Sequence, residues 1–343
     1  AGVEVILYDE VAPPPTVEMV NRGAALALKN GCDVVVALGG GSPIDTGKAI
    51  AVVAGHSSET PQSIWDFIRP DGPTKEITSK TLPTVVATST SGSGSHVTKD
   101  AVITNLATRQ KQGFGAPFMF PSTAIIDPDV LCKMPPELTA ASGFDALTHA
   151  VESFFSKHSN PISELYSLEA VRLIYRSLVC AYKNGDDCQA RTEMALADTY
   201  AAWADTVTSD ILAHAMAHPI TGHYPEVAHG VSLAVVFPAV MRFNLEGADE
   251  WTIEKYARVA RASAGGPLSD CVSEREEAME GLKLLDALLE TLNLRLRLRD
   301  LGVSKVDIPA LAEDALLTMR WAAEANPRKA TKEEIEVLYE QCY

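Results

Sequence analysis

The chain has 343 residues, a length that suggests two domains. It carries 45 Asp and Glu residues against 29 Lys and Arg residues, a formal net charge of −16. This acidic balance repels nucleic-acid phosphates, so we expect no nucleic-acid partner. No apolar run reaches about 18 residues, so we expect no transmembrane helix and no membrane partner.

The six cysteines are scattered along the chain, and none forms a C-x-x-C pair. Their spacing argues against a zinc-thiolate ribbon. Scattered single cysteines in a long chain are typical of reduced thiols in a cytosolic protein. No signal peptide is visible at the start of the sequence. We therefore expect a cytoplasmic location.

The first third of the chain alternates predicted strands and helices. Helical spacing over Val17–Asn30 ends at Gly31, and a second helix is predicted from Pro43 to Ala54. Runs rich in β-branched residues predict strands at Val3–Tyr8, Asp33–Leu38, Leu82–Ala87, Val97–Thr104 and Ala124–Ile126. Repeated strand–loop–helix units predict a doubly wound parallel sheet.

After Pro135-Pro136 the strand patterns almost vanish, and helical periodicity takes over. We predict a domain boundary near residue 135. The helices expected beyond it are Ser142–Lys157, Pro161–Asn184, Ala190–His218, Val231–Phe243, Trp251–Ala264, Val272–Leu292, Ile308–Ala323 and Lys332–Tyr343.

A glycine-rich loop joins the Asp33–Leu38 strand to the helix that follows it. Gly39-Gly40-Gly41 lets backbone N–H groups approach an anion, and the helix N-terminus adds a positive dipole end. The loop is neither a G-x-G-x-x-G fingerprint nor a Walker A motif. It could equally be a tight strand-to-helix turn, but its setting favours phosphate binding.

A second small-residue loop, Thr88–Ser95, follows the next buried strand. Its hydroxyls and glycines could bond a ribose or a phosphate, or form a flexible connection. Its position favours the first reading, because open α/β sheets bind ligands at the carboxyl ends of their strands.

Most histidines of the chain gather in the helical half. Asp145 and His149 are four residues apart, which places both side chains on one face of a helix. His214 and His218 repeat this spacing, and two more histidines follow them: His223 and His229. Of eight histidines in the chain, five belong to this set, so it is a candidate metal site.

The ligand types define the chemistry of this candidate site. A single helical histidine is more often structural, but one carboxylate with several imidazoles is typical of Fe²⁺, Zn²⁺ or Mn²⁺. A metal that polarises an alcohol oxygen, combined with a nicotinamide that takes the carbinol hydride, would make an alcohol dehydrogenase.

These motifs resemble those of the iron-containing (group III) metal-dependent alcohol dehydrogenases. The matching segments occur in the family's order along essentially the whole chain: Gly39–Lys48, Thr88–Ser95, Ile126–Pro128, Gly143–Glu152 and His214–Gly230. The resemblance implies a dehydroquinate synthase-like architecture. An N-terminal Rossmann-like α/β domain (1–135) would bind NAD or NADP, an all-α C-terminal domain (136–343) would bind the metal, and the active site would lie between them. It also implies a homo-oligomer, commonly a dimer.

The resemblance implies a ligand set for Fe²⁺ or Zn²⁺: Asp145, His149, His214 and His229. His218 would be a non-ligand histidine near the substrate and a candidate proton relay. The interval from His214 to His229 is about one residue longer than the family pattern, so His223 competes with His229 as a ligand. We prefer His229, because His-Gly ends the family motif.

The resemblance also implies a cofactor site. Residues of the first loop would hold the pyrophosphate, with Asp45 in the same motif: Gly40, Gly41 and Ser42. Residues of the second loop would line the adenine-ribose side: Thr88, Ser89 and Ser91. Lys111 would reach the ribose near the nicotinamide, although a single lysine is as often a hydrated surface residue.

The sequence departs from the family pattern at its start. Members usually begin with a further strand–helix unit that helps to select NAD over NADP. We expect this unit to be absent here, which leaves the choice of cofactor open. His96 stands where an acidic residue is common, and Pro14 replaces a polar residue expected near the nicotinamide.

The expected function is NAD(P)-linked oxidation of a small primary alcohol or diol, or reduction of the matching aldehyde. Two alternatives remain. The same fold could catalyse a different reaction, as in glycerol dehydrogenase or dehydroquinate synthase. A truncated, non-catalytic metal-binding paralogue is the other.

Overall fold

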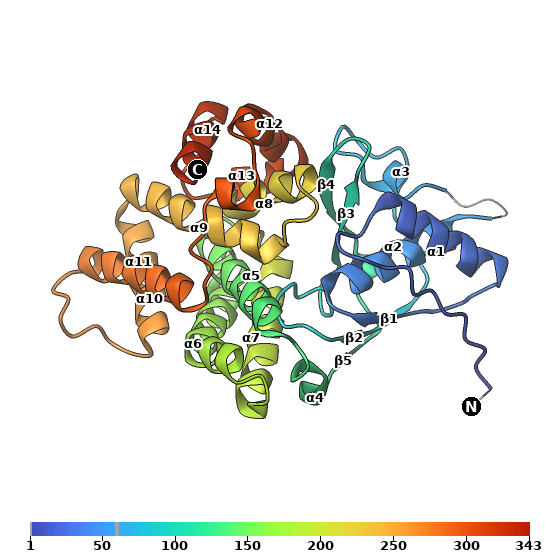
Figure 1. Cartoon of the computed structure of the whole chain (residues 1–343), viewed down its shortest axis with the longest axis horizontal. Helices are drawn as coiled ribbons and strands as arrows, with labels where there is room; N and C mark the ends of the chain where they lie inside the picture. The colour runs from blue at the N-terminus through green and yellow to red at the C-terminus, as the bar shows by residue number, and fades with distance from the viewer. Residues whose placement is uncertain (1, 59–61) are drawn as a thin grey trace. The chain divides into compact units, whose positions relative to one another are not determined.

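The structure, a computed structural model, describes residues 2–58 and 62–343. The chain divides into two compact units. Figure 1 colours the chain by residue number, from blue at the N-terminus to red at the C-terminus, so the segments of each unit can be followed in it. The first comprises Ala1–Ser89 and Ser95–Ile126, and the second comprises Thr90–Gly94 and Asp127–Tyr343. The first mixes strands with helices, whereas the described residues of the second form helices and loops only. The predicted fold class, α/β followed by all-α, is confirmed.

A parallel sheet organises the first unit. Its strands are β1 (Val35–Gly39), β2 (Thr84–Thr88) and β5 (Thr123–Ile126), in the order β1-β2-β5. Gly39 pairs with Thr88, so β1 and β2 end at the same edge of the sheet. The two small-residue loops predicted from the sequence therefore leave the sheet side by side.

Helices α1 (Val17–Lys29) and α2 (Gly41–His56) pack together, and the short α3 (Trp65–Ile68) joins their apolar core. The Thr16 hydroxyl caps α1 by accepting a hydrogen bond from Met19 N. Ile44 of α2 packs against Ala37 and Val86 on one face of the sheet.

The opposite face of the sheet is exposed. The strand register aligns Leu38, Ala87 and Ile125, and the side chains of Leu38 and Ile125 are 69% and 50% exposed. Val36, two residues before Leu38, is 69% exposed as well. Parallel sheets are normally covered on both faces, so this apolar face lacks its second layer within the described residues.

Two strand predictions are corrected in this unit. Val3–Tyr8 is not a strand, because no described strand lies beside it to take its backbone hydrogen bonds. The predicted strand Val97–Thr104 does not join the parallel sheet. It becomes β3 (Asp100–Asn105) and pairs antiparallel with β4 (Gln110–Gly115), a strand not predicted. The connection 106–109 is too short for a parallel crossover.

The second unit is built from helices. They are α4 (Pro128–Leu131), α5 (Pro136–Phe155), α6 (Pro161–Lys183), α7 (Cys188–Val207), α8 (Leu212–His223), α9 (His229–Glu246), α10 (Glu250–Ala264), α11 (Glu274–Thr291), α12 (Ile308–Thr318), α13 (Arg320–Ala325) and α14 (Lys332–Gln341). The helices predicted as single segments over Ala190–His218 and Ile308–Ala323 are each two helices. None of the described helices has both the length and the apolar character needed to cross a bilayer.

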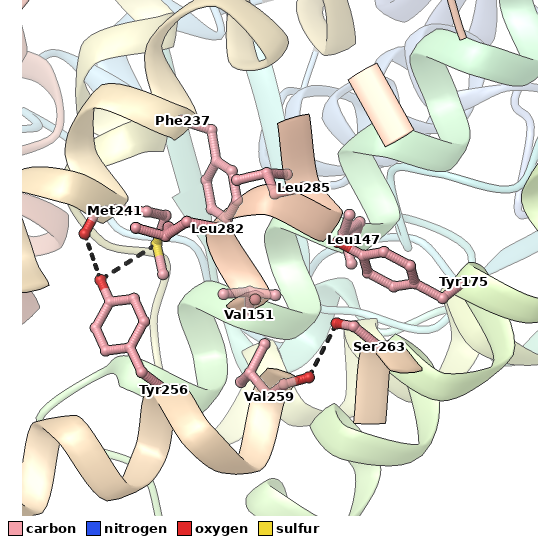
Figure 2. A pocket seen from close by; sticks show the side chains of 11 residues that line it. Leu147, Val151, Tyr175, Phe237, Met241, Tyr256, Val259, Ser263, Leu282 and Leu285 are labelled. Carbon is pink, nitrogen blue, oxygen red and sulfur yellow. Dashed lines mark hydrogen bonds between the residues drawn. The ribbon is translucent and has the colours of Figure 1, made fainter. Parts of the chain in front are cut away.

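A small apolar cavity lies in the core of this unit, with a volume of ≈ 30 Å³. Figure 2 shows its lining, which includes Leu147 and Val151 from α5 and Phe237 from α9. Tyr256 turns its hydroxyl to Met241 O, 2.6 Å away. The cavity holds about one water-sized sphere, so we read it as imperfect packing rather than a ligand site.

A buried lysine ties α2 to the hairpin. Lys48 is 1% exposed, and its Nζ donates to Thr98 O at 2.8 Å and to Asp100 O at 2.7 Å. Burial lowers the pKa of Lys48 to about 8, although the nearby Asp45 and Asp100 carboxylates oppose the change. Burial and the Lys48 charge also lower the pKa of His96 to about 4.

The Lys48 amine should make stability depend on pH. Its pKa is lower in the folded state than the unfolded value of about 10.4, so between these values the unfolded chain binds more protons. The free energy of unfolding of the wild type should therefore rise, relative to Lys48→Met, between about pH 8 and 10.4, by on the order of 3 kcal/mol. Urea titrations at several pH values measure this difference. The exposed Lys80→Met is the control, and a gap between wild type and Lys48→Met that stays constant with pH would contradict the prediction.

Candidate functional site

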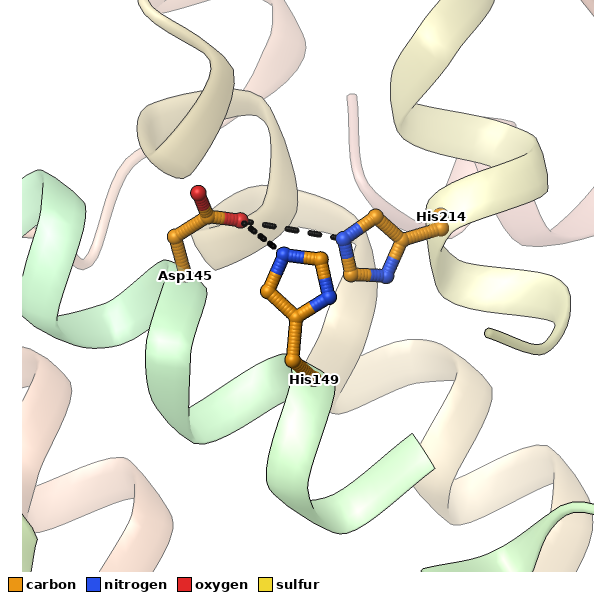
Figure 3. A group of neighbouring side chains, drawn as sticks. All are labelled: Asp145, His149 and His214. Carbon is orange, nitrogen blue, oxygen red and sulfur yellow. Dashed lines mark ion pairs between the residues drawn. The ribbon is translucent and has the colours of Figure 1, made fainter. Parts of the chain in front are cut away.

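The four predicted metal ligands lie together in the second unit. The Nε2 atoms of His149, His214 and His229 lie 3.5, 3.7 and 3.7 Å from a single oxygen, Oδ1 of Asp145. Figure 3 shows Asp145, His149 and His214 pointing toward one another. Ligands that share one tetrahedral ion through bonds of about 2.1 Å are separated by about 3.4 Å, close to the observed distances.

Three helices bring these side chains together. Asp145 and His149 lie one turn apart on α5, His214 lies near the start of α8, and His229 begins α9. A Cβ added to Gly230 would lie 1.9 Å from Ala141 O of α5. Glycine at this position therefore allows α9 to start against α5, which explains the His-Gly pair in the sequence.

Two buried carboxylates orient His214 and His149 through their Nδ1 atoms. Oε2 of Glu152 lies 2.5 Å from Nδ1 of His214, and Oδ1 of Asp210 lies 3.1 Å from Nδ1 of His149. With each Nδ1–H bonded to a carboxylate, the Nε2 lone pairs face Asp145, which is the arrangement of metal-binding histidines.

Glu152 has a second role in the local fold. Its carboxylate accepts hydrogen bonds from the backbone N–H groups of Ile211, Ala213 and His214, at 3.0, 2.9 and 3.3 Å. These donors belong to the break between α7 and α8 and to the first turn of α8. The sequence predicted one helix across this break between α7 and α8. Because the helix is interrupted there, these N–H groups are free to bond Glu152, whereas in a continuous helix they would bond backbone carbonyls.

The site strongly favours positive charge at its centre. Burial disfavours the charged imidazolium, but the carboxylates of Asp210 and Asp145 outweigh burial and raise the pKa of His149 to about 9. Asp210 and Glu152 likewise hold the pKa of His214 well above its ordinary value.

Two atoms of the cluster show that a cation fits. Oδ1 of Asp145 and Nε2 of His214 are buried and form no hydrogen bond. Buried polar atoms without such partners are costly, and a divalent cation among the four side chains would satisfy both. The donor set of one carboxylate and three imidazoles suits Fe²⁺ or Zn²⁺.

The other two histidines of the set, His218 and His223, have different surroundings. The His218 ring is buried beside the cluster, with its centroid 5.2 Å from that of His229. His223 turns away, and its Nε2 lies 2.6 Å from Oδ2 of Asp314. The geometry thus groups His229, and not His223, with the other three side chains.

The first glycine-rich loop forms the N-terminus of α2. Gly40 is the N-cap residue and offers no side-chain cap, so the N–H groups of Gly41 and Ser42 begin the helix without one. Gly39 has a φ of 144°, and an added Cβ would lie 2.6 Å from Cγ of Pro43. The loop has the backbone form that binds an anion at a helix N-terminus.

The other predicted cofactor residues lie in different surroundings. Both oxygens of Asp45 accept hydrogen bonds within the first unit, from Ser95 Oγ at 2.5 Å and Val102 N at 2.9 Å, so Asp45 orders the loop and the hairpin. Lys111 lies on β4 and is 7% exposed, so the hydrated-lysine alternative is wrong. Thr88 is the last residue of β2. The next residue, Ser89, donates its N–H to Gly39 O at 2.9 Å. Ser91 is buried and belongs to the second unit.

Asp198 holds the second loop and was not anticipated from the sequence. This buried carboxylate on α7 accepts a hydrogen bond from Gly94 N at 2.9 Å, and burial raises its pKa to about 7. A Cβ at Gly94 would lie 2.3 Å from Ala202 Cβ, and one at Gly92 would lie 2.5 Å from Ser142 O. The two glycines therefore let Thr90–Gly94 pack closely against α5 and α7.

Known proteins are similar to this chain in sequence and in fold. Residues 1–128 match the family described as iron-containing alcohol dehydrogenase, and residues 139–343 match the C-terminal part of the Fe-containing alcohol dehydrogenase family. The 1,3-propanediol dehydrogenase of Klebsiella pneumoniae is 36% identical over 343 residues, an alignment that covers 100% of this chain and 84% of that protein.

Solved structures of similar proteins have the same fold as this chain. The archaeal halo-thermophilic Red Sea brine pool alcohol dehydrogenase ADH/D1, bound to NZQ, is 43% identical with a TM-score of 0.96, covering 100% of this chain and 85% of that one. The sulfoacetaldehyde reductase of Bifidobacterium kashiwanohense, solved in complex with NAD⁺, is 28% identical with a TM-score of 0.81, covering 97% and 82%. Family matches over both units, together with the clustered carboxylate and histidines, show that this chain belongs to the iron-containing alcohol dehydrogenase family.

Proposed function

We propose that the chain is a metal-dependent, NAD(P)-linked dehydrogenase of small primary alcohols or diols that also reduces the matching aldehydes. One observation carries the proposal: three histidine Nε2 atoms surround one buried oxygen of Asp145. The 1,3-propanediol dehydrogenase among the relatives supports a short diol as the substrate class.

Four side chains would hold the metal: Asp145, His149, His214 and His229. When bound, Fe²⁺ or Zn²⁺ would act as a Lewis acid toward the substrate oxygen. Glu152 and Asp210 keep the His214 and His149 rings oriented through their Nδ1 atoms, so the ligand atoms need little rearrangement.

The loop at the start of α2 would hold the pyrophosphate of NAD or NADP through Gly40, Gly41 and Ser42. The nicotinamide would exchange hydride with the substrate carbon. Because the chain carries a net charge of −16, local N–H groups and the α2 dipole, rather than the overall field, must attract the anionic cofactor. The NAD⁺ complex of the sulfoacetaldehyde reductase supports NAD for this chain. Thr88, Ser89, Ser91 and Lys111 remain proposed contacts.

His218 would pass the substrate proton to solvent. It lies one turn from His214 on α8, and its ring centroid is 5.2 Å from that of His229, so it is close to two of the proposed metal ligands. An imidazole is suited to this role because its ordinary pKa lies near neutrality.

The alternatives have less support. A synthase that grips a phosphorylated acid needs several basic side chains, whereas the groups around the histidines are the carboxylates of Asp145, Glu152 and Asp210. A non-catalytic paralogue would not need to keep the complete ligand set with its orienting carboxylates. We further propose that the protein is cytoplasmic, since its six cysteines are free thiols. That it forms a homo-oligomer is a proposal that rests on the family resemblance alone.

Replacing one proposed ligand should release the metal. We expect His149→Ala to lose most of its bound iron or zinc after dialysis, because the remaining side chains leave a coordination position empty. Metal per chain, measured by plasma mass spectrometry, tests this. His223→Ala is the matched control, since His223 bonds Asp314 instead, and it should keep its metal. Full metal content in His149→Ala, or loss of metal from His223→Ala, would contradict the proposed ligand set.

Removing the charge behind His214 should weaken binding without removing a ligand. We expect Glu152→Gln to lower metal affinity by about 10–100-fold, because a neutral amide orients the imidazole less strongly. Competition with a coloured chelator gives the dissociation constant. Glu169→Gln, on the partly exposed Glu169–Arg172 pair of α6, should bind as the wild type does. Equal affinities for the wild type and Glu152→Gln would show that Glu152 serves folding alone.

The metal-loaded chain should oxidise short primary alcohols and diols with NAD⁺ or NADP⁺, and a chelator should abolish the rate. His218→Ala should keep its metal but lose about 100-fold or more in kcat, with a flatter pH profile, because a proton relay is lost. Absorbance of the reduced nicotinamide at a series of pH values measures both. A metal-loaded protein that is inactive on the whole alcohol and aldehyde panel would reject the proposed function.

A further inference from the structure

Two cysteine thiols from distant parts of the chain touch in the second unit. Sγ of Cys132 and Sγ of Cys188 are 3.6 Å apart, although 56 positions separate the two residues. Cys132 is the C-cap residue of α4, and Cys188 is the first residue of α7. Both are free thiols.

Buried neighbours hold both backbones in place. Leu131, next to Cys132, packs with Met134 against Ala195 of α7. Arg191, one turn after Cys188, is 2% exposed. Its guanidinium donates to Met134 O at 3.1 Å and to Thr139 Oγ1 at 2.8 Å. These contacts join the α4–α5 connection to the start of α7, so the thiol contact is a fixed feature of the fold.

The two sulfurs differ in how easily a reagent reaches them. Cys188 is exposed and Cys132 is partly buried. Burial, together with the adjacent Cys188 sulfur, raises the pKa of Cys132. A dissolved oxidant therefore meets Cys188 first, while Cys132 is placed to attack a sulfur already bonded to Cys188.

We propose that Cys132 and Cys188 are a redox modification site. They form a reversible disulfide with each other, and a low-molecular-weight disulfide is the oxidant. The sulfurs must approach by about 1.6 Å to reach bonding distance. The site is separate from the proposed metal ligands and does not depend on the proposed function.

The exchange balances in two steps. The Cys188 thiolate attacks one sulfur of oxidised glutathione, whose disulfide breaks and releases one glutathione thiolate. Cys132 then loses its proton to solvent and attacks Cys188 Sγ, which releases the second glutathione. Two protein thiols are oxidised to one disulfide, and one molecule of oxidised glutathione is reduced to two thiols.

The disulfide would close a loop that contains all of α5 and α6. Helix α5 carries Asp145 and His149, so the crosslink would enclose half of the proposed ligand set. Cross-linking a long loop restricts the unfolded chain, and the oxidised protein should therefore unfold at a higher temperature than the reduced protein.

The test is equilibration of the full-length chain in glutathione buffers from reducing to oxidising. We expect a peptide crosslinked between Cys132 and Cys188, lighter by two hydrogen atoms than its reduced parts, and two fewer titratable thiols out of six. The thermal midpoint should rise with the crosslinked fraction, and dithiothreitol should reverse all three changes.

Matched variants separate this pair from the other thiols. Cys188→Ser should lose the crosslink and the thermal shift, whereas Cys180→Ser, which removes an exposed thiol of α6, should keep both. Glutathione attached to Cys188 alone, a crosslink between two copies of the chain, or a crosslink that pairs other cysteines would overturn the proposal.

Discussion

The buried carboxylate of Glu152 is the interaction on which the site depends most. It is 0% exposed and lies 2.5 Å from the His214 imidazole, so its charge must be compensated within the fold. Three backbone N–H groups at the start of α8 provide that compensation, and they are available because α7 ends before α8 begins. The same carboxylate therefore satisfies the N-terminus of α8, orients a histidine and joins α5 to α8. Local folding and metal chemistry cannot be separated at this residue.

Acidic groups set the electrostatics both of the whole chain and of the histidine cluster. Over the whole chain they produce a net charge of −16, which opposes an anionic cofactor, so glycine backbone at the α2 N-terminus is the feature suited to hold it. Around the histidines, three buried carboxylates favour positive charge at the centre of the cluster. They are Asp145, Glu152 and Asp210. Close backbone approach, as at Gly230 and Gly92, then sets the distances.

The sheet of the first unit explains both the successes and the failures of strand prediction. Asp33–Leu38 and Leu82–Ala87 are recognisable because β-branched runs are typical of buried parallel strands. The run Val3–Tyr8 has a similar composition but stays outside the sheet, since a strand exists only where a partner takes its hydrogen bonds. On the other face, the side chains of Val36, Leu38 and Ile125 stay exposed, because none of the described helices packs over them.

The sequence by itself determined the fold class, the two small-residue loops after strands, and the histidine set, because periodicity and residue type are local properties. The motifs also occur along the chain in the order typical of the iron-containing alcohol dehydrogenases, so the sequence indicated the family. The sequence already favoured His229 over His223 through the His-Gly motif, and the structure places His229 beside Asp145 and His223 beside Asp314. Tertiary structure alone decided that Asp45 bonds Ser95 and Val102, and that Glu152, Asp210 and Asp198 support the site. Each of these contacts joins residues far apart in the chain. Spacing along one chain carries no information on which distant side chain will complete a hydrogen bond or neutralise a charge.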